Sequence, residues 1–397
     1  MSPTTPAGPR HQPLLRPASP ARLAWLADEV QAWREAGVVD GDQAAAILAG
    51  YSPGRRFSLV RLLTGVGAAF VGIGALWLVA ANLESLSPLA RFVLVTLVWV
   101  AALTGGEVLQ ARSASPPAVA ATRLVAALLV GGVVMQAAQS LQVPAWEPAL
   151  VGWWSLAALV HAYVARAVPP LVVGVLAGSA YAVWAPLDAG ASGLGVVLAL
   201  GVVGVGALAL AAPHERVGLP VFARVWRESG LVLVLASLVV AAVPWTTAGE
   251  RPATSALMLL LGVGSALVVL GLLVGGPGDR VEVLGALAAL GTALVLVAWE
   301  AGADAEVVTG PDVAHAVLGV AACAVACIAV AATGTLRDDR RLVALATTAL
   351  VVVTTLQAFT VFAPVLEGAW LFLLLGLVLV GTGLVFDRAR RHVTAAL

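Results

Sequence analysis

The chain has 397 residues, of which 60% are hydrophobic and only 11% are charged, and its 22 basic residues are balanced by 22 acidic ones. Globular domains carry about 25% charged residues, so this composition excludes an ordinary soluble protein and indicates a polytopic membrane protein. The net charge of zero also excludes a bulk electrostatic attraction to nucleic acid.

Residues 1–20 are rich in proline and contain almost nothing that could be buried in a core. The sequence therefore predicts a disordered tail there. No secretory signal is expected, because the first long apolar run begins only near Leu62 and has no small-residue cleavage pattern. We expect that run to be retained as the first membrane span.

Residues 21–57 are predicted to form a short cytoplasmic helical hairpin. Leu26, Val30 and Trp33 recur at helical spacing and form one apolar stripe of its first helix. Gly37 stands where a glycine commonly ends a helix. The pattern is that of an amphipathic helix with one face for packing.

The second helix of the hairpin is predicted to begin at Asp40, with Gln43 three residues later completing a capping box. A unit of about thirty residues has little core of its own, so we expect it to dock on the membrane domain, on a partner or on a second copy. A stabilising cap and a protein-docking role are equal alternatives here. The candidate docking residues are Trp33, Gly37, Gln43, Ile47 and Tyr51.

Residues 58–387 are predicted to form a transmembrane helical domain. Apolar runs long enough to cross about 30 Å of hydrocarbon recur along it. The sequence therefore predicts an all-α, polytopic helical membrane protein with about twelve transmembrane helices, ten being the alternative count. The expected spans are residues 62–82, 90–111, 122–142, 148–166, 169–186, 193–212, 229–246, 254–275, 281–300, 313–333, 341–363 and 367–386.

The arginines predict the orientation of these spans. If the N-terminus is cytoplasmic, all of the 22 basic residues except Arg91 and Arg251 fall on the inner side, as the positive-inside rule requires. We therefore expect both termini to be cytoplasmic, residues 388–397 to form a basic cytoplasmic tail, and the protein to lie in the cell inner (cytoplasmic) membrane.

Polar side chains inside the expected spans are the candidates for function. Gln136, Gln139 and Ser140 share one helix face, and Asn82 closes the first span at the same outer level. His161 lies in the inner half of the fourth span. The candidate polar intramembrane site is Asn82, Gln136, Gln139 and His161. One alternative is interhelical hydrogen bonding, worth about 0.6 kcal/mol per contact, and the other is a site for a solute or a lipid headgroup.

The acidic residues stand away from the predicted membrane midplane, which disfavours ion- or proton-coupled transport. Glu107 lies near the inner boundary, where it is expected to pair with Arg112 or Arg123. The chain has no HExxH sequence and no convincing nucleophile with a base partner. The sequence therefore predicts no enzymatic activity, no catalytic residue, no cofactor and no metal site.

The segment LADEVQAWREAGVVDGDQAAAILAGY, followed by VGIGALWLVAANLESLSPLAR, resembles the bacterial predicted-membrane-protein family called domain of unknown function 2157. The resemblance extends over residues 22–170, through Gln139 and the Trp153-Trp154 pair. Leu83 follows Asn82 where the family often has tryptophan, and the aromatic residue expected soon after Gln139 is absent. The resemblance implies a bacterial inner-membrane protein with a cytoplasmic hairpin and supplies no activity. The matching positions at its start are Trp33, Gly37, Val39, Asp40, Gln43, Ala44, Ile47, Leu48, Tyr51, Gly72, Gly74, Ala81, Asn82, Pro88 and Arg91.

Two functions follow as hypotheses. The preferred one is a non-enzymatic membrane scaffold or regulator, which uses the hairpin to bind a protein partner or a second copy of itself. The alternative is an uncoupled permease or lipid-handling protein with a polar site between helices. The lipid bilayer is a partner in both, and nucleic acid in neither.

Overall fold

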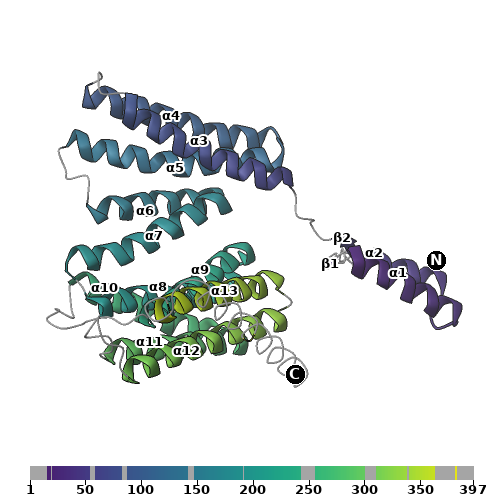
Figure 1. Ribbon diagram of the computed structural model, residues 1–397. Helices are drawn as coiled ribbons and strands as arrows, with labels where there is room; N and C mark the ends of the chain where they lie inside the picture. The colour runs from purple at the N-terminus through teal and green to yellow at the C-terminus, as the bar shows by residue number, and fades with distance from the viewer. Residues whose placement is uncertain are drawn as a thin grey trace, which may run out of the picture. The chain divides into compact units, whose positions relative to one another are not determined.

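The computed structural model describes residues 16–18, 20–53, 59–82, 87–141, 147–190, 192–242, 255–299, 310–337, 339–362 and residue 381. This part of the chain is helical apart from two strands of three residues each. The chain divides into two compact units, Met1–Val66 and Gly67–Leu397, and each is treated by itself below (Figure 1).

The first unit contains helices α1 (Pro20–Glu35) and α2 (Gly41–Ala49). Gly37 follows α1 with a positive φ of 69°, a conformation that glycine adopts without strain, and the N–H of Val38 donates to the carbonyl of Trp33 over 2.8 Å. Before α2, the backbone N–H of Gln43 donates to Asp40 Oδ1 over 2.7 Å, and the N–H of Asp40 donates to Gln43 Oε1 over 3.1 Å. The predicted capping box is therefore confirmed.

Strands β1 (Arg16–Ala18) and β2 (Tyr51–Pro53) pair in parallel, with Arg16 opposite Tyr51. This pairing was not predicted, because strands of three residues that contain proline and serine carry no strand periodicity. It joins the segments that flank α1 and α2.

The second unit is built from long helices. Helix α3 begins among the residues of the first unit and ends among those of the second. Each expected span from 62–82 to 341–363 overlaps one of these helices, whereas the expected span 367–386 lies outside the described residues except for residue 381. The helices are α3 (Leu59–Asn82), α4 (Pro88–Ala111), α5 (Pro116–Ser140), α6 (Pro148–Ala165), α7 (Val168–Asp188), α8 (Gly193–Arg216), α9 (Pro220–Ala241), α10 (Ser255–Val274), α11 (Pro277–Ala298), α12 (Gly310–Leu336) and α13 (Arg340–Phe362).

Eight helices in the described part of the chain are long and apolar enough to cross a membrane: α4 to α8, α10, α11 and residues Ala314–Leu336 of α12. The structure thus confirms an all-helical protein with several apolar helices, and the count of twelve spans stays a prediction. Proline in the first turn marks the start of α4, α5, α6, α7, α9 and α11, where its missing N–H costs no hydrogen bond.

Helix α8 lies at the centre of the second unit, because it contacts α7, α9, α10 and α11. Gly204 and Gly230 bring the backbones of α8 and α9 together: a Cβ built on Gly230 would lie 2.6 Å from both the carbonyl oxygen of Gly204 and the nitrogen of Leu208. Gly271 does the same for α10 against Ala209 of α8. Small residues thus allow the close helix approach that is common in lipid.

The main buried cluster lies between α8, α9, α11, α12 and α13, with Leu208, Leu235 and Leu342 among its members. Helix α4, in contrast, packs mainly on α5 and buries few of its own side chains. Figure 1 shows α4 and α5 side by side at one end of this unit and α8 to α13 at the other.

Candidate functional site

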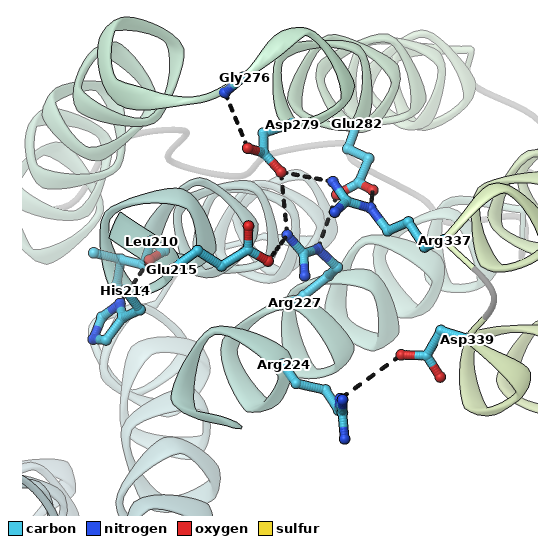
Figure 2. A network of polar contacts seen from close by, with 10 residues as sticks. All are labelled: Leu210, His214, Glu215, Arg224, Arg227, Gly276, Asp279, Glu282, Arg337 and Asp339. Atoms are coloured by element: carbon cyan, nitrogen blue, oxygen red, sulfur yellow. Dashed lines mark hydrogen bonds and ion pairs between the residues drawn. The ribbon is translucent and has the colours of Figure 1, made fainter. Parts of the chain in front are cut away.

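Charged side chains gather where the ends of α8, α9, α11 and α12 meet, and they form a network around Arg227 (Figure 2). The Arg227 side chain is only 8% exposed. Its Nε donates to Glu282 Oε2 over 3.0 Å, and its Nη2 donates to Glu215 Oε1 over 2.9 Å and to Asp279 Oδ1 over 3.2 Å. One guanidinium from α9 thus binds carboxylates from both α8 and α11.

Arg337, just beyond the end of α12, completes this network. Its Nη2 donates to Asp279 Oδ1 over 2.6 Å, and its Nε donates to Glu282. Burial by itself lowers the pKa of the Arg337 guanidinium, but the charge of Glu282 and the hydrogen bonds to Glu282 and Asp279 outweigh burial and raise that pKa. We call Glu215, Arg227, Asp279, Glu282 and Arg337 the ionic cluster.

The start of α11 explains why the carboxylates lie here. Pro277 and Asp279 occupy its first turn, and the N–H of Gly276 donates to Asp279 Oδ2 over 3.0 Å. Glu282 follows Asp279 at a spacing of three and therefore shares its helix face. Acidic groups are favoured at a helix N-terminus by the unpaired N–H groups there. Nearby, Arg224 Nε lies 3.8 Å from Asp339 Oδ2 in a more exposed pair.

A second polar contact chain joins α6, α8 and α9 beside the ionic cluster. Nδ1 of His214 lies 2.6 Å from the carbonyl oxygen of Leu210, which can only accept, so Nδ1 carries the proton. In the neutral ring, Nε2 of His214 then accepts from the Tyr163 hydroxyl over 2.8 Å, and Nε1 of Trp226 donates to that hydroxyl over 3.0 Å. His214 and Glu215 are consecutive, so the end of α8 takes part in both networks.

A separate ion pair joins α4 to α5. Arg123 Nε donates to Glu107 Oε1 over 3.0 Å and Arg123 Nη2 donates to Glu107 Oε2 over 2.8 Å, which confirms one of the two expected partners of Glu107. His161 of α6 interacts electrostatically with both groups. Its Nε2 is buried without a hydrogen-bond partner in the part of the chain that the structure describes.

The predicted intramembrane site is brought together only in part. Gln136 Nε2 donates to Gln139 Oε1 over 3.0 Å, and the Ser140 hydroxyl lies 2.8 Å from the carbonyl oxygen of Gln136, its own helix neighbour. His161 lies instead near Arg123, about 20 Å further along α5 from Gln136 at 1.5 Å per residue. Asn82 ends α3, and its side chain lies outside the described residues.

The five candidate docking residues all lie in the first unit. Trp33 is 37% exposed, Gln43 is exposed, and Ile47 and Tyr51 are half-buried. Gly37 provides the turn after α1. The side chains that pack inward are Val30, which is 2% exposed, and Ala44.

Sequence reasoning missed the ionic cluster. Two signals were present: an arginine, Arg227, just before the apolar run of α9, and the Asp279–Glu282 pair at a spacing of three. Neither predicts that residues 215, 227, 279 and 337 meet, because that depends on how four helices pack. Among the described residues, no group of three or more His, Cys, Asp or Glu side chains is placed to hold a metal ion.

Residues 31–171 match the family model described as predicted membrane protein (DUF2157), which confirms the resemblance from the end of α1 to the start of α7. Neither the curated proteins nor the solved structures include a match to the chain. The apolar helices fit a membrane protein, and the family match carries no molecular activity.

Proposed function

We propose that the chain is a multi-pass bacterial inner-membrane protein that acts as a non-enzymatic scaffold or regulator, with residues 21–57 as its cytoplasmic docking hairpin. The observation that carries the proposal is the use of polar groups for internal contacts in the second unit. Arg227, Arg337 and Arg123 bind carboxylates of neighbouring helices, and Gln136 binds Gln139.

The glycine contacts support the same function. Gly204, Gly230 and Gly271 leave no room even for a methyl group between α8 and its neighbours. Such backbone contacts give a rigid frame, whereas alternating-access transporters rely on parts that move past one another. The first unit has exposed apolar side chains such as Trp33, so we expect a protein partner to bind there.

We also propose twelve spans with both termini in the cytoplasm, the twelfth being residues 367–386. Arginines at the ends of helices support this orientation, since Arg166 follows α6, Arg216 is the last residue of α8 and Arg280 lies in the first turn of α11. These ends all fall on the inner side of the proposed topology. The ionic cluster then lies at the cytoplasmic ends of its helices.

Alkaline phosphatase fusions test this topology. Fusions made after Leu141 and after Gly190 are expected to be active, because both positions would face the periplasm. Fusions after Arg112 and after Gly218 are expected to be inactive. The reverse pattern, or activity at all four points, would refute the proposed orientation.

The docking role is tested with the double variant Trp33→Ala, Ile47→Ala, expressed as the full chain and cross-linked in cells. We expect the variant to insert normally into the membrane and to lose a cross-linked partner that the unaltered chain recovers. Trp153→Ala with Val164→Ala is the matched control, because both side chains are exposed in the second unit and the loss of apolar volume is similar. A double variant that keeps its partner would contradict the proposal.

The alternative, an uncoupled permease or lipid-handling protein using Asn82, Gln136, Gln139 and His161, is favoured by one observation. The buried Nε2 of His161 has no partner among the described residues, although Glu107 and Arg123 lie near it. A ligand could satisfy that nitrogen. Solutes or lipids that raise the unfolding temperature of the unaltered chain, and fail to do so for Gln139→Ala and His161→Ala, would support this alternative.

A further inference from the structure

Helix α1 exposes two tryptophans, which is unusual for the largest apolar side chain. Trp25 is 59% exposed and Trp33 is 37% exposed, while Val30 on the same helix is 2% exposed. Val30 packs inward as predicted, whereas Trp33, which the sequence placed on the same apolar stripe, stays partly exposed and joins Trp25 on the exposed surface of the helix. Tryptophan is the residue type most enriched among those that dominate binding energy at protein interfaces.

Glu29 lies between the two tryptophans. Trp25, Glu29 and Trp33 follow one another at a spacing of four, so each step turns about 40° around the helix and rises about 6 Å. The three side chains therefore form a shallow row of two indole rings with a carboxylate between them. We call these three residues the Trp-Glu-Trp ridge.

The charge around the ridge is negative. Residues 20–53 contain five carboxylates and two arginines, a formal charge of −3, and Asp28, Glu35, Asp40 and Asp42 are exposed. The cytoplasmic surface of a membrane is also negative, so it repels this surface. The same carboxylates repel a second copy of α1 and α2. Arg55, Arg56 and Arg61, between residue 53 and the apolar part of α3, suit the lipid headgroups instead.

We propose that the Trp-Glu-Trp ridge binds a cationic segment of a protein partner, with an arginine of that segment paired with Glu29 and stacked on an indole face. Arginine fits best, because its planar guanidinium both stacks on aromatic rings and binds a carboxylate through two N–H groups. This inference rests on the proposed docking function and names the chemistry of the partner. It assigns Trp25 and Glu29, which the sequence analysis left aside, to the docking surface.

The test uses the full chain in a neutral detergent and a fluorescent helical peptide that carries arginines one turn apart on an alanine background. Binding is followed by fluorescence anisotropy. We expect the peptide to bind, and the same peptide with glutamine in place of arginine not to bind. Trp25→Leu and Glu29→Gln are each expected to weaken binding about three- to fivefold, the size typical of exposed cation–π contacts and ion pairs.

Glu35→Gln is the matched control for Glu29→Gln. Glu35 is exposed on the same helix, but it lies six residues on and about 120° around the helix from Glu29. The proposal requires Glu35→Gln to leave peptide binding unchanged. Equal losses from the two variants would show attraction by net charge alone and would overturn it, as would peptide binding that Trp25→Leu leaves intact.

Two further measurements test whether the Trp-Glu-Trp ridge binds a membrane or a second copy of the chain instead. Binding of the full chain to phosphatidylglycerol vesicles that Trp25→Leu abolishes would identify the membrane, and a cross-linked dimer that depends on Trp25 would identify a second copy. Either result overturns the proposal. If the arginine peptide fails while Trp33→Ala, Ile47→Ala still loses its partner in cells, the docking function stands and only the cationic partner is wrong.

Discussion

The α8–α9 and α4–α5 pairs are both neighbouring helices of one unit, yet they are held together differently. In the most apolar stretch of α8, 67% of the residues are buried, against 11% in α4. Backbones touch at Gly204 and Gly230, whereas a Cβ on Gly105 of α4 would lie 3.7 Å from the Thr122 methyl group, an ordinary contact. The first pair behaves as a core and the second as an outer layer.

The same difference appears in their arginines. Arg227 binds three carboxylates from two helices, and its Glu282 partner is 7% exposed. Arg123 binds the single carboxylate of Glu107, which is half exposed. A charge that loses its partner near water is solvated, whereas one that loses it in a packed interior is not. We infer that an arginine on an apolar helix stabilises the fold more when the carboxylate that it binds is buried.

The largest expected effect is that of Arg227→Leu. It leaves Glu215 without its partner and Glu282 and Asp279 with Arg337 alone, and removing one member of a buried ion pair costs about 3–5 kcal/mol. The free energy of unfolding, measured by sodium dodecyl sulfate titration in mixed micelles, is expected to fall by that amount. Arg123→Leu should cost less, and Arg224→Leu, one turn away in an exposed pair, should cost least. Equal losses for Arg227 and Arg123 would break the comparison.

Gly230→Ala is expected to have the next largest effect. Its Cβ would meet backbone atoms of Gly204 and Leu208, which cannot turn away as a side chain can. Overpacking of this kind costs about 1–3 kcal/mol. Gly105→Ala in α4 is the control, and it should be neutral or stabilise by up to about 1 kcal/mol, because alanine favours the helix and meets no close atom. A destabilised Gly105→Ala would show that the outer layer is as tightly packed as the core.

Two consecutive tryptophans of α6 allow the same comparison between a packed side chain and an exposed one. Trp154 Nε1 donates to the carbonyl oxygen of Ala127 on α5 over 2.8 Å, while Trp153 is 61% exposed. Trp154→Phe removes that hydrogen bond and is expected to cost about 1 kcal/mol by the same titration. Trp153→Phe should cost nothing measurable. Similar losses for the two would mean that the Ala127 contact does not stabilise the α5–α6 interface.

The sequence predicted the elements well because their signals are local. Apolar length placed α3 to α13, and Asp40 with Gln43 predicted a cap that the hydrogen bonds confirm. Glu107 with Arg123 was predictable because only residues 112–115 separate α4 from α5, so the two consecutive helices pack side by side. In each case the partners are near in sequence.

The ionic cluster was not predictable for the opposite reason. Residues 215 and 337 are far apart in sequence, and they come close only through the packing of α8, α9, α11 and α12 against one another. Helical periodicity gives the face of a residue but not the helix opposite that face. The position of His161 could not be predicted for the same reason. It lies near Arg123 and not near Gln136 because of the level along the helices at which α6 packs.

Gln139→Ala is the smallest effect and the one that decides between the two functions. It removes the partner of Gln136, a side chain that is 8% exposed, and a hydrogen-bonded pair of side chains three residues apart on one helix is worth about 0.2–0.5 kcal/mol. If the amides only hold the helices, the loss should be of this size and should be the same with and without added phosphatidylglycerol, and Gln110→Ala on the exposed side of α4 should cost less. A loss that grows when lipid is added would mean that Gln139 binds the lipid in the unaltered chain, because a ligand that binds only the folded protein adds to its stability. The outer-layer helices, which have little packing to lose, would then be the functional part of the molecule, and the tightly packed α8–α9 core would serve as their support.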